Sequence, residues 1–237
     1  MSILAGKRIL VTRALNQNAK LIAKLESRGA IALVYPCIEI AFLPFEIPHA
    51  HYDWVIFTSQ NAVKALGNLT LSQDIQIATV GPKTSPLTPL HPVERGIKHP
   101  VHTFNSKSLA QLFENQPPQK ILLPQGDLAD HSLADTLTQQ GHDVTRLTVY
   151  STRKPTNPVA FDFGPLDAVT FTSPSTIKNF CDLRGLPAEA LAQAGEVIAC
   201  IGTTTYQAAR DLGFTNLIHA KEHSLDGLVQ ILEEYFT

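Results

Sequence analysis

The stretch from Asp167 to Thr176, DAVTFTSPST, decides the fold of this chain. Its apolar residues predict a buried strand, and the hydroxyl residues behind them predict that the strand leads directly into a helix. Ser173 is a favourable N-cap, and Pro174 suits the first helical position, where its missing N–H costs nothing. Such a helix start presents free backbone N–H groups at the strand end, where an anion can bind.

The same pattern occurs a second time, from Asp53 to Val63, DWVIFTSQNAV. Both copies contain Asp, then Val two residues later, then Phe-Thr-Ser before a helix, and the two aspartates are 167 − 53 = 114 positions apart. Further landmarks repeat in the same order at separations of 112 to 121: strand 9–11 with 121–123, Gly29 with Gly141, Gly81 with Gly202, and Ser108 with Ser224 in two capped helices. The chain is therefore predicted to contain an internal duplication.

Each copy alternates strands with amphipathic helices. This alternation predicts an α/β fold in which helices cover both faces of a parallel sheet. A copy of roughly 110 residues has the size of a doubly wound, flavodoxin-like domain. Prolines between Ser85 and Pro100 are expected to break the helix after Gly81, whereas the second copy keeps a normal helix from Thr204 to Leu212.

Composition argues against several classes of partner. The formal net charge of −2 creates no global field that would attract nucleic acid. No apolar run reaches the length of a membrane span, and the N-terminus lacks the features of a signal peptide. Cys37, Cys181 and Cys200 are scattered without a CxxC motif, which is typical of reduced, small buried residues. We therefore expect a cytoplasmic protein.

Hydroxyl and basic residues gather where the predicted strands end. In an open α/β sheet, ligands bind outside the carboxyl ends of the strands. Any one of these residues is more often only a helix cap, but together they favour a binding cleft between two domains, with these candidates: Thr12, Arg13, Thr58, Ser59, Thr84, Ser173, Ser175, Thr203, Thr204 and Thr205. Because neither GxGxxG nor a P-loop motif is present, the cleft suits a ligand with several separate carboxylates better than a nucleotide.

Other polar residues have simpler interpretations. The pairs His49 with His51 and His219 with His223 lack the cysteines or carboxylates that would complete a metal site, so surface histidines are expected. Asp53 and Asp167 precede strands, at the end opposite the predicted cleft, and are interpreted as structural.

Tyr150 ends an alternating strand just before the interdomain linker. Its phenol could reach the cleft from that position. A packed surface tyrosine is nevertheless the more common outcome for such a residue.

Six segments in this order and spacing resemble the uroporphyrinogen-III synthase family over essentially the whole chain. They are ILVTR (9–13), VIFTSQNAV (55–63), VGPKT (80–84), LTVYST (147–152), VTFTSPS (169–175) and IGTTT (201–205). The resemblance implies two flavodoxin-like domains joined by a two-stranded linker. The first would comprise residues 1–36 and 154–237, the second 40–148, and the linker 37–39 and 149–153.

The resemblance also implies a reaction. The family dehydrates and cyclises hydroxymethylbilane with inversion of ring D, which gives uroporphyrinogen III. It uses no metal or organic cofactor, and a monomer is expected, with at most transient contact with the preceding pathway enzyme. By the same resemblance, Tyr150 is the acid that helps the hydroxyl to leave as water, and the following are polar binding positions: Ser59, Thr84, Ser173, Thr204 and Thr205.

Two departures from the family pattern are visible. Many relatives carry an arginine where this chain has Asp130, so a carboxylate contact is lost or is moved to Lys83 or Arg153. The prolines from Pro86 to Pro92 disturb the helix expected after Gly81, next to Thr84.

Two alternatives remain open. One is a non-catalytic two-domain binding protein or sensor for a carboxylated metabolite, which would explain the hydroxyl residues without requiring Tyr150. The other is a protein-interaction scaffold, which would expose an apolar patch.

Overall fold

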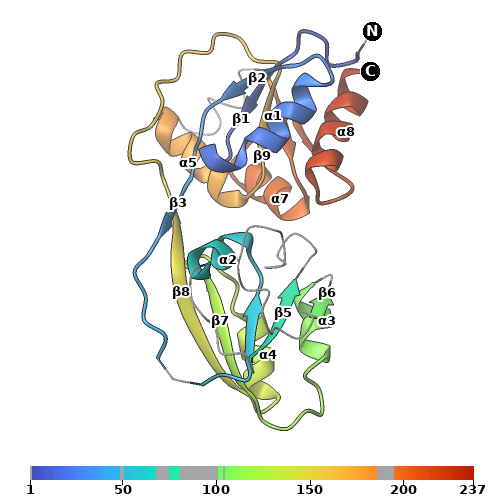
Figure 1. Ribbon diagram of the computed structural model, residues 1–237. Helices are drawn as coiled ribbons and strands as arrows, with labels where there is room; N and C mark the ends of the chain where they lie inside the picture. The colour runs from blue at the N-terminus through green and yellow to red at the C-terminus, as the bar shows by residue number, and fades with distance from the viewer. Residues whose placement is uncertain (1, 49–50, 68–74, 81–100, 104, 186–194) are drawn as a thin grey trace. The chain divides into compact units, whose positions relative to one another are not determined.

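The computed structural model describes residues 2–48, 51–67, 75–80, 101–103, 105–185 and 195–237 (Figure 1). The chain divides into two compact units. Unit 1 comprises Met1–Glu39 and Arg153–Thr237, and unit 2 comprises Ile40–Thr152. No helix in the described ranges is long and apolar enough to cross a membrane.

Unit 1 is built on a five-stranded sheet with the order β11-β10-β9-β1-β2. Its neighbouring strands are parallel: β1 (Arg8–Val11), β2 (Ile31–Val34), β9 (Ala168–Phe171), β10 (Val197–Cys200) and β11 (Leu217–His219). Its helices are η1 (Leu15–Gln17), α1 (Ala19–Glu26), α5 (Pro174–Arg184), α7 (Thr203–Asp211) and α8 (Leu225–Phe236).

Alternation along β1 explains why helices pack on both faces of this sheet. Leu10 belongs to one apolar cluster, together with Phe180 of α5 and Ala209 of α7. Ile9 and Val11 point the other way, into a cluster formed with residues of α1 and α8. Because successive residues of a strand face opposite sides, one short apolar strand supplies both cores.

A six-stranded sheet with the order β3-β8-β7-β4-β5-β6 forms the centre of unit 2. Its strands are β3 (Glu39–Phe42), β4 (Trp54–Phe57), β5 (Gln76–Val80), β6 (Val101–Thr103), β7 (Lys120–Gly126) and β8 (Asp143–Arg153). Its helices are α2 (Gln60–Leu66), α3 (Ser106–Gln111) and α4 (Ser132–Gln139). Two apolar clusters again divide the strand residues, with Val55 and Phe57 in one and Ile56 in the other.

The predicted α/β class with parallel sheets is confirmed, and so are several local predictions. Ser173 caps α5, and Pro174 is its first residue. Gly29 and Gly141 follow α1 and α4 with φ of 80° and 92°, values that a residue with a side chain rarely adopts. One cap differs from the expectation: α3 begins at Ser106 with Asn105 as its N-cap, so Ser108 lies inside the helix.

Candidate functional site

The two predicted structural aspartates hold equivalent strand ends. The Asp53 carboxylate accepts a hydrogen bond from the Lys120 amide at 2.7 Å, and Asp167 accepts one from the Arg8 amide at 2.8 Å. Lys7 Nζ lies 2.9 Å from the Asp167 carboxylate. Burial raises the pKa of Asp167, but the hydrogen bonds from Arg8 and Lys7 outweigh it, so the pKa is lowered overall. The structural interpretation of both residues is confirmed.

Unit 2 brings together two of the predicted site residues, Tyr150 and Ser59. The Tyr150 hydroxyl donates to Ser59 Oγ at 3.0 Å. Ser59 is the N-cap of α2, and its Oγ also accepts from the Asn61 amide at 3.1 Å. A hydroxyl has two acceptor positions and one donor. Because Tyr150 and Asn61 occupy both acceptor positions, the Ser59 O–H remains available as a donor.

Tyr150 lies on β8 and is positioned by the neighbouring strand β7. Its backbone carbonyl accepts from the Asp127 amide at 3.1 Å, next to the register shift at the end of β7. A Cβ at Gly126 would lie 2.5 Å from Tyr150 Cε2, so only glycine leaves room for the ring. The ring is half-buried, and its hydroxyl reaches the end of β4, where Thr58 is also half-buried.

At the end of β1 in unit 1, the two predicted residues behave differently. The Thr12 side chain is fully buried, and its hydroxyl donates to the Thr170 carbonyl at 2.7 Å. Thr170 returns a hydrogen bond to the Leu10 carbonyl at 2.8 Å, so the two threonines tie β1 to β9. Because the Thr12 hydroxyl is used in this strand contact, only the backbone of Thr12 could bind a ligand.

Arg13 is a half-buried cation. One guanidinium nitrogen donates to Gln17 Oε1 at 3.3 Å, while buried Nε has no hydrogen-bond partner within the described part of the chain. Burial lowers the pKa of Arg13, because the charged form is poorly solvated. A carboxylate would satisfy both the charge and the unpaired Nε.

The hydroxyls at the start of α5 bond mainly to one another. Ser173 Oγ lies 2.9 Å from Ser175 Oγ and accepts from the Thr176 amide at 3.4 Å. Thr176 Oγ1 in turn accepts from the Ser173 amide at 3.3 Å, which completes a capping box. Ser173 and Ser175 are half-buried and lie at the carboxyl end of β9.

Unlike α5, helix α7 begins without a side-chain cap. Its N-cap is Gly202, which offers no side-chain acceptor, and its first turn contains no acidic residue. Thr203 and Thr204 are exposed, whereas Thr205 is only 3% exposed. These threonines line a pocket of about 200 Å³ together with Ala220, Lys221 and His223. His223 is exposed, as the sequence predicted for a surface histidine, and its ring lies against Gly202, where a Cβ would be 2.8 Å from His223 Cδ2.

Several other predictions concern residues away from these strand ends. Thr84, Lys83 and Pro86–Pro92 lie outside the described residues. Asp130 Oδ1 accepts from the Ser132 amide at 2.6 Å, so it serves the start of α4. Arg153 pairs with Glu39 at 2.7 Å. Hydrogen bonds from Thr156 and then from Arg153 lower the pKa of Glu39 to about 2. Arg153 thus already has a carboxylate partner.

Metal-ligating residues do not cluster anywhere in the described ranges. All three cysteines are free thiols; Cys37 and Cys200 are buried, and Cys181 is half-buried. Burial raises the pKa of Cys200 to about 12 and that of Cys37 further, which keeps both thiols protonated.

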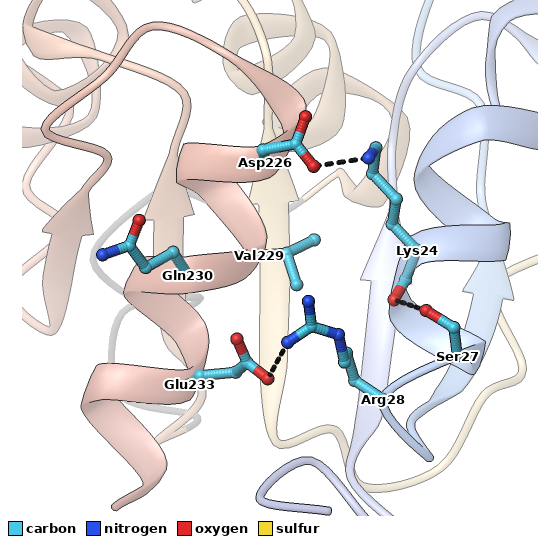
Figure 2. Close-up of a pocket in the computed structure, with 7 residues that line it drawn as sticks. All are labelled: Lys24, Ser27, Arg28, Asp226, Val229, Gln230 and Glu233. Carbon is cyan, nitrogen blue, oxygen red and sulfur yellow. Dashed lines mark hydrogen bonds and ion pairs between the residues drawn. The ribbon is translucent and has the colours of Figure 1, made fainter.

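The groove between α1 and α8 of unit 1 has a volume of about 390 Å³ (Figure 2). Lys24 pairs with Asp226 across it, and Arg28 pairs with Glu233 at 2.7 Å. Since its charges neutralise each other and it contains none of the predicted site residues, we interpret it as a helix–helix contact on the surface.

The family model described as Uroporphyrinogen-III synthase HemD matches residues 19–230. The chain belongs to this family. A uroporphyrinogen-III synthase from Synechococcus elongatus is 30% identical, over 98% of this chain and 96% of the relative. The chloroplastic uroporphyrinogen-III synthase of Oryza sativa is 28% identical, over 95% of this chain and 80% of the relative.

The fold is also similar to that of a solved structure. The crystal structure of uroporphyrinogen-III synthetase from Helicobacter pylori 26695 aligns with a TM-score of 0.67 at 18% identity. The alignment covers 97% of this chain and 99% of that one. The family match and the relatives confirm the family of cyclising lyases predicted from the sequence and favour it over a non-catalytic sensor. The structural similarity confirms the fold.

Proposed function

We propose that this protein converts hydroxymethylbilane to uroporphyrinogen III, with loss of water and inversion of ring D. Family membership over residues 19–230 carries this proposal. The hydrogen-bonded pair of Tyr150 and Ser59 supports it, because a phenol at the end of a strand is a suitable proton donor for the departing hydroxyl.

Tyr150 has the role of general acid in the proposed reaction. The C–O bond of the hydroxymethyl group breaks, its electron pair leaves with the oxygen, and the Tyr150 proton completes a water molecule. The proton released when the ring closes restores the phenol. Ser59 holds the phenol in place before substrate binds, with a 3.0 Å hydrogen bond.

The remaining strand-end residues bind separate carboxylates of the substrate. Arg13 offers an unpaired guanidinium N–H, and Ser173, Ser175 and Thr203–Thr205 offer hydroxyls or helix-start amides. Thr58 and Thr84 complete the set, and Thr12 contributes through its backbone. Fixing the flexible chain in one shape selects one ring closure, and each tenfold of selectivity requires about 1.4 kcal/mol.

We further propose that the two units are flavodoxin-like domains that arose by duplication, with residues 37–39 and 149–153 as a two-stranded linker. The sheet orders support this. Starting from β2 and from β8, they read β2-β1-β9-β10-β11 and β8-β7-β4-β5-β6, with one further strand, β3, beside β8. Both follow the flavodoxin order 2-1-3-4-5 if unit 2 is counted from β7. The boundaries at 36, 40, 148 and 154 lie within a few residues of those of the two compact units.

The setting we propose is the cytoplasm, with the protein acting as a monomer without metal or organic cofactor. Its contact with the enzyme that supplies the substrate would be transient. The net charge of −2 supports the absence of a nucleic-acid partner.

The function is tested by incubating the purified protein with hydroxymethylbilane and separating isomers I and III after oxidation. We expect isomer III with protein and isomer I without it, because the substrate also cyclises unaided to the uninverted isomer. The same isomer mixture in both reactions would contradict the proposal.

A further inference from the structure

The strand that carries Tyr150 changes register just before this residue. Along most of β8 the pairing with β7 advances one residue at a time, up to the pair of Gln125 with Thr148. The next pair is Gly126 with Tyr150, so Val149 is an extra residue on β8. One extra residue in a strand is a β-bulge, and it turns the side chains that follow toward the other face of the sheet.

This bulge decides which face of the sheet Tyr150 occupies. Leu147 and Val149 lie in the apolar cluster that includes residues of α2, whereas Val144 packs against the cluster on the other face. Because successive residues of a regular strand face opposite sides, Tyr150 would be expected on the side of Val144. It packs instead against the cluster of Leu147 and Val149, where its hydroxyl reaches Ser59 at the start of α2.

Asp127 bonds to β8 on either side of Ser151. Its amide donates to the Tyr150 carbonyl at 3.1 Å, and its carboxylate Oδ1 accepts from the Thr152 amide at 2.9 Å. Since β7 ends at Gly126, the carboxylate supplies the acceptor that a further strand residue would otherwise provide. Because Asp127 is exposed, it contributes these hydrogen bonds rather than packing.

We propose that Asp127 is a positioning residue, whose carboxylate holds the bulged end of β8 so that the Tyr150 phenol points to Ser59. This inference rests on the proposed function and adds to it the residue that fixes the orientation of the acid. Loss of the carboxylate releases the Thr152 amide and loosens the strand next to Tyr150. A small displacement of a catalytic group is enough to slow a reaction, because the rate depends steeply on geometry.

Steady-state kinetics with hydroxymethylbilane test this role. For Asp127→Ala we expect kcat to fall about three- to tenfold with KM unchanged, because the acid is misaligned while the binding groups are untouched. Asp127→Asn keeps an oxygen acceptor for the Thr152 amide and should recover most of kcat. Asp130→Ala is the matched control: it also removes an exposed carboxylate that accepts from a backbone amide, but at the start of α4, and should leave kcat unchanged.

A combination of variants shows whether Asp127 acts through Tyr150. In the Tyr150→Phe background, Asp127→Ala should cause no further fall in kcat, because no phenolic proton remains to be positioned. An unchanged kcat in Asp127→Ala alone, or the same fold loss in both backgrounds, would overturn the inference and leave the proposed function intact.

A spectroscopic measurement reads the ring position without turnover. NMR signals of isotope-labelled tyrosine rings are compared, and that of Tyr150 is assigned by its absence in Tyr150→Phe. We expect this signal to shift or broaden in Asp127→Ala and to keep its wild-type position in Asp130→Ala. A wild-type signal in Asp127→Ala would overturn the inference, whereas a wild type that yields only isomer I would overturn the proposed function.

Discussion

The two Phe-Thr-Ser segments of this protein are alike where their strands begin and different where they end. At the start of β4, Asp53 and Lys120 exchange two hydrogen bonds through the Asp53 carboxylate and amide, and at the start of β9, Asp167 and Arg8 do the same. After the ends of these strands, Ser59 accepts a hydrogen bond from the Tyr150 phenol, whereas Ser173 forms a capping box with Thr176.

The amino edge of each sheet thus has a structural role, and the carboxyl edge carries the residues proposed for binding and catalysis. The aspartates hold neighbouring strands in register at the amino edge, so substitutions there are expected to lower the stability of the sheet. The carboxyl edge carries helix starts, which tolerate different partners. Unit 2 uses its helix start to hold a phenol, and unit 1 leaves the start of α7 without a side-chain cap. The catalytic acid we propose therefore belongs to one copy of the motif only.

The largest effect should come from the shared phenylalanine of the two segments. Phe171 is fully buried against Phe180, and Phe57 is 3% exposed. Replacing either by alanine should lower the free energy of unfolding by about 3–5 kcal/mol, because each leaves a cavity in its own unit. Chemical denaturation measures this, with the single tryptophan, Trp54, as the fluorescence probe of unit 2. A loss below about 1 kcal/mol in one variant would break the equivalence of the two segments.

Loss of the phenol in unit 2 should come next. Tyr150→Phe keeps the ring above Gly126 and removes the proton donor, so kcat should fall about 100-fold. Tyr235→Phe is the matched control, because that hydroxyl bonds to Asn216 on the surface of unit 1. A near-wild-type kcat in Tyr150→Phe would remove this residue from the mechanism.

At the amino edge, Asp167→Asn should lower the free energy of unfolding by about 1–3 kcal/mol at pH 7, because charge-assisted hydrogen bonds from Arg8 and Lys7 are weakened. The pKa of Asp167 is lowered in the folded state. Its stabilising effect is therefore present above the ordinary aspartate pKa and is lost as the pH falls through the lowered folded value. Denaturation of wild type and variant should give converging stabilities in acid, and a constant difference would contradict this reasoning.

The smallest effects are expected at the two serine caps. Ser59→Ala and Ser173→Ala should each lower stability by about 1 kcal/mol, since each removes an N-cap acceptor. Their kinetics should differ, because only Ser59 positions Tyr150: Ser59→Ala should lower kcat, and Ser173→Ala should mainly raise KM. Identical kinetic changes would mean that the two helix starts have the same role.

Local signals in the sequence were enough to predict much of this scaffold. The cap at Ser173, the glycines after α1 and α4, and the strand-start aspartates depend on neighbours a few residues away or on a repeated motif. Asn105 was missed because Asn105 and Ser108 are both good caps three residues apart, and the helix begins at the first of them.

The predicted site needed information that short stretches do not contain. Tyr150 and Ser59 are 91 positions apart and meet only through the register of β8, β7 and β4. Thr12 ends a strand like the other candidates, yet its side chain turns inward, because the direction of a strand-end residue depends on the packing of β9. His223 lies against Gly202 because the two residues follow the neighbouring strands β11 and β10, which are distant in sequence.

The central claim is that the protein catalyses the inverted closure rather than merely binding the polyacid. The most direct measurement is a time course with hydroxymethylbilane in large molar excess over protein, with isomers I and III separated at each point. We predict that isomer III accumulates to many molecules per molecule of protein while isomer I stays minor. Isomer III that never exceeds the amount of protein, or isomer I throughout, would contradict this account.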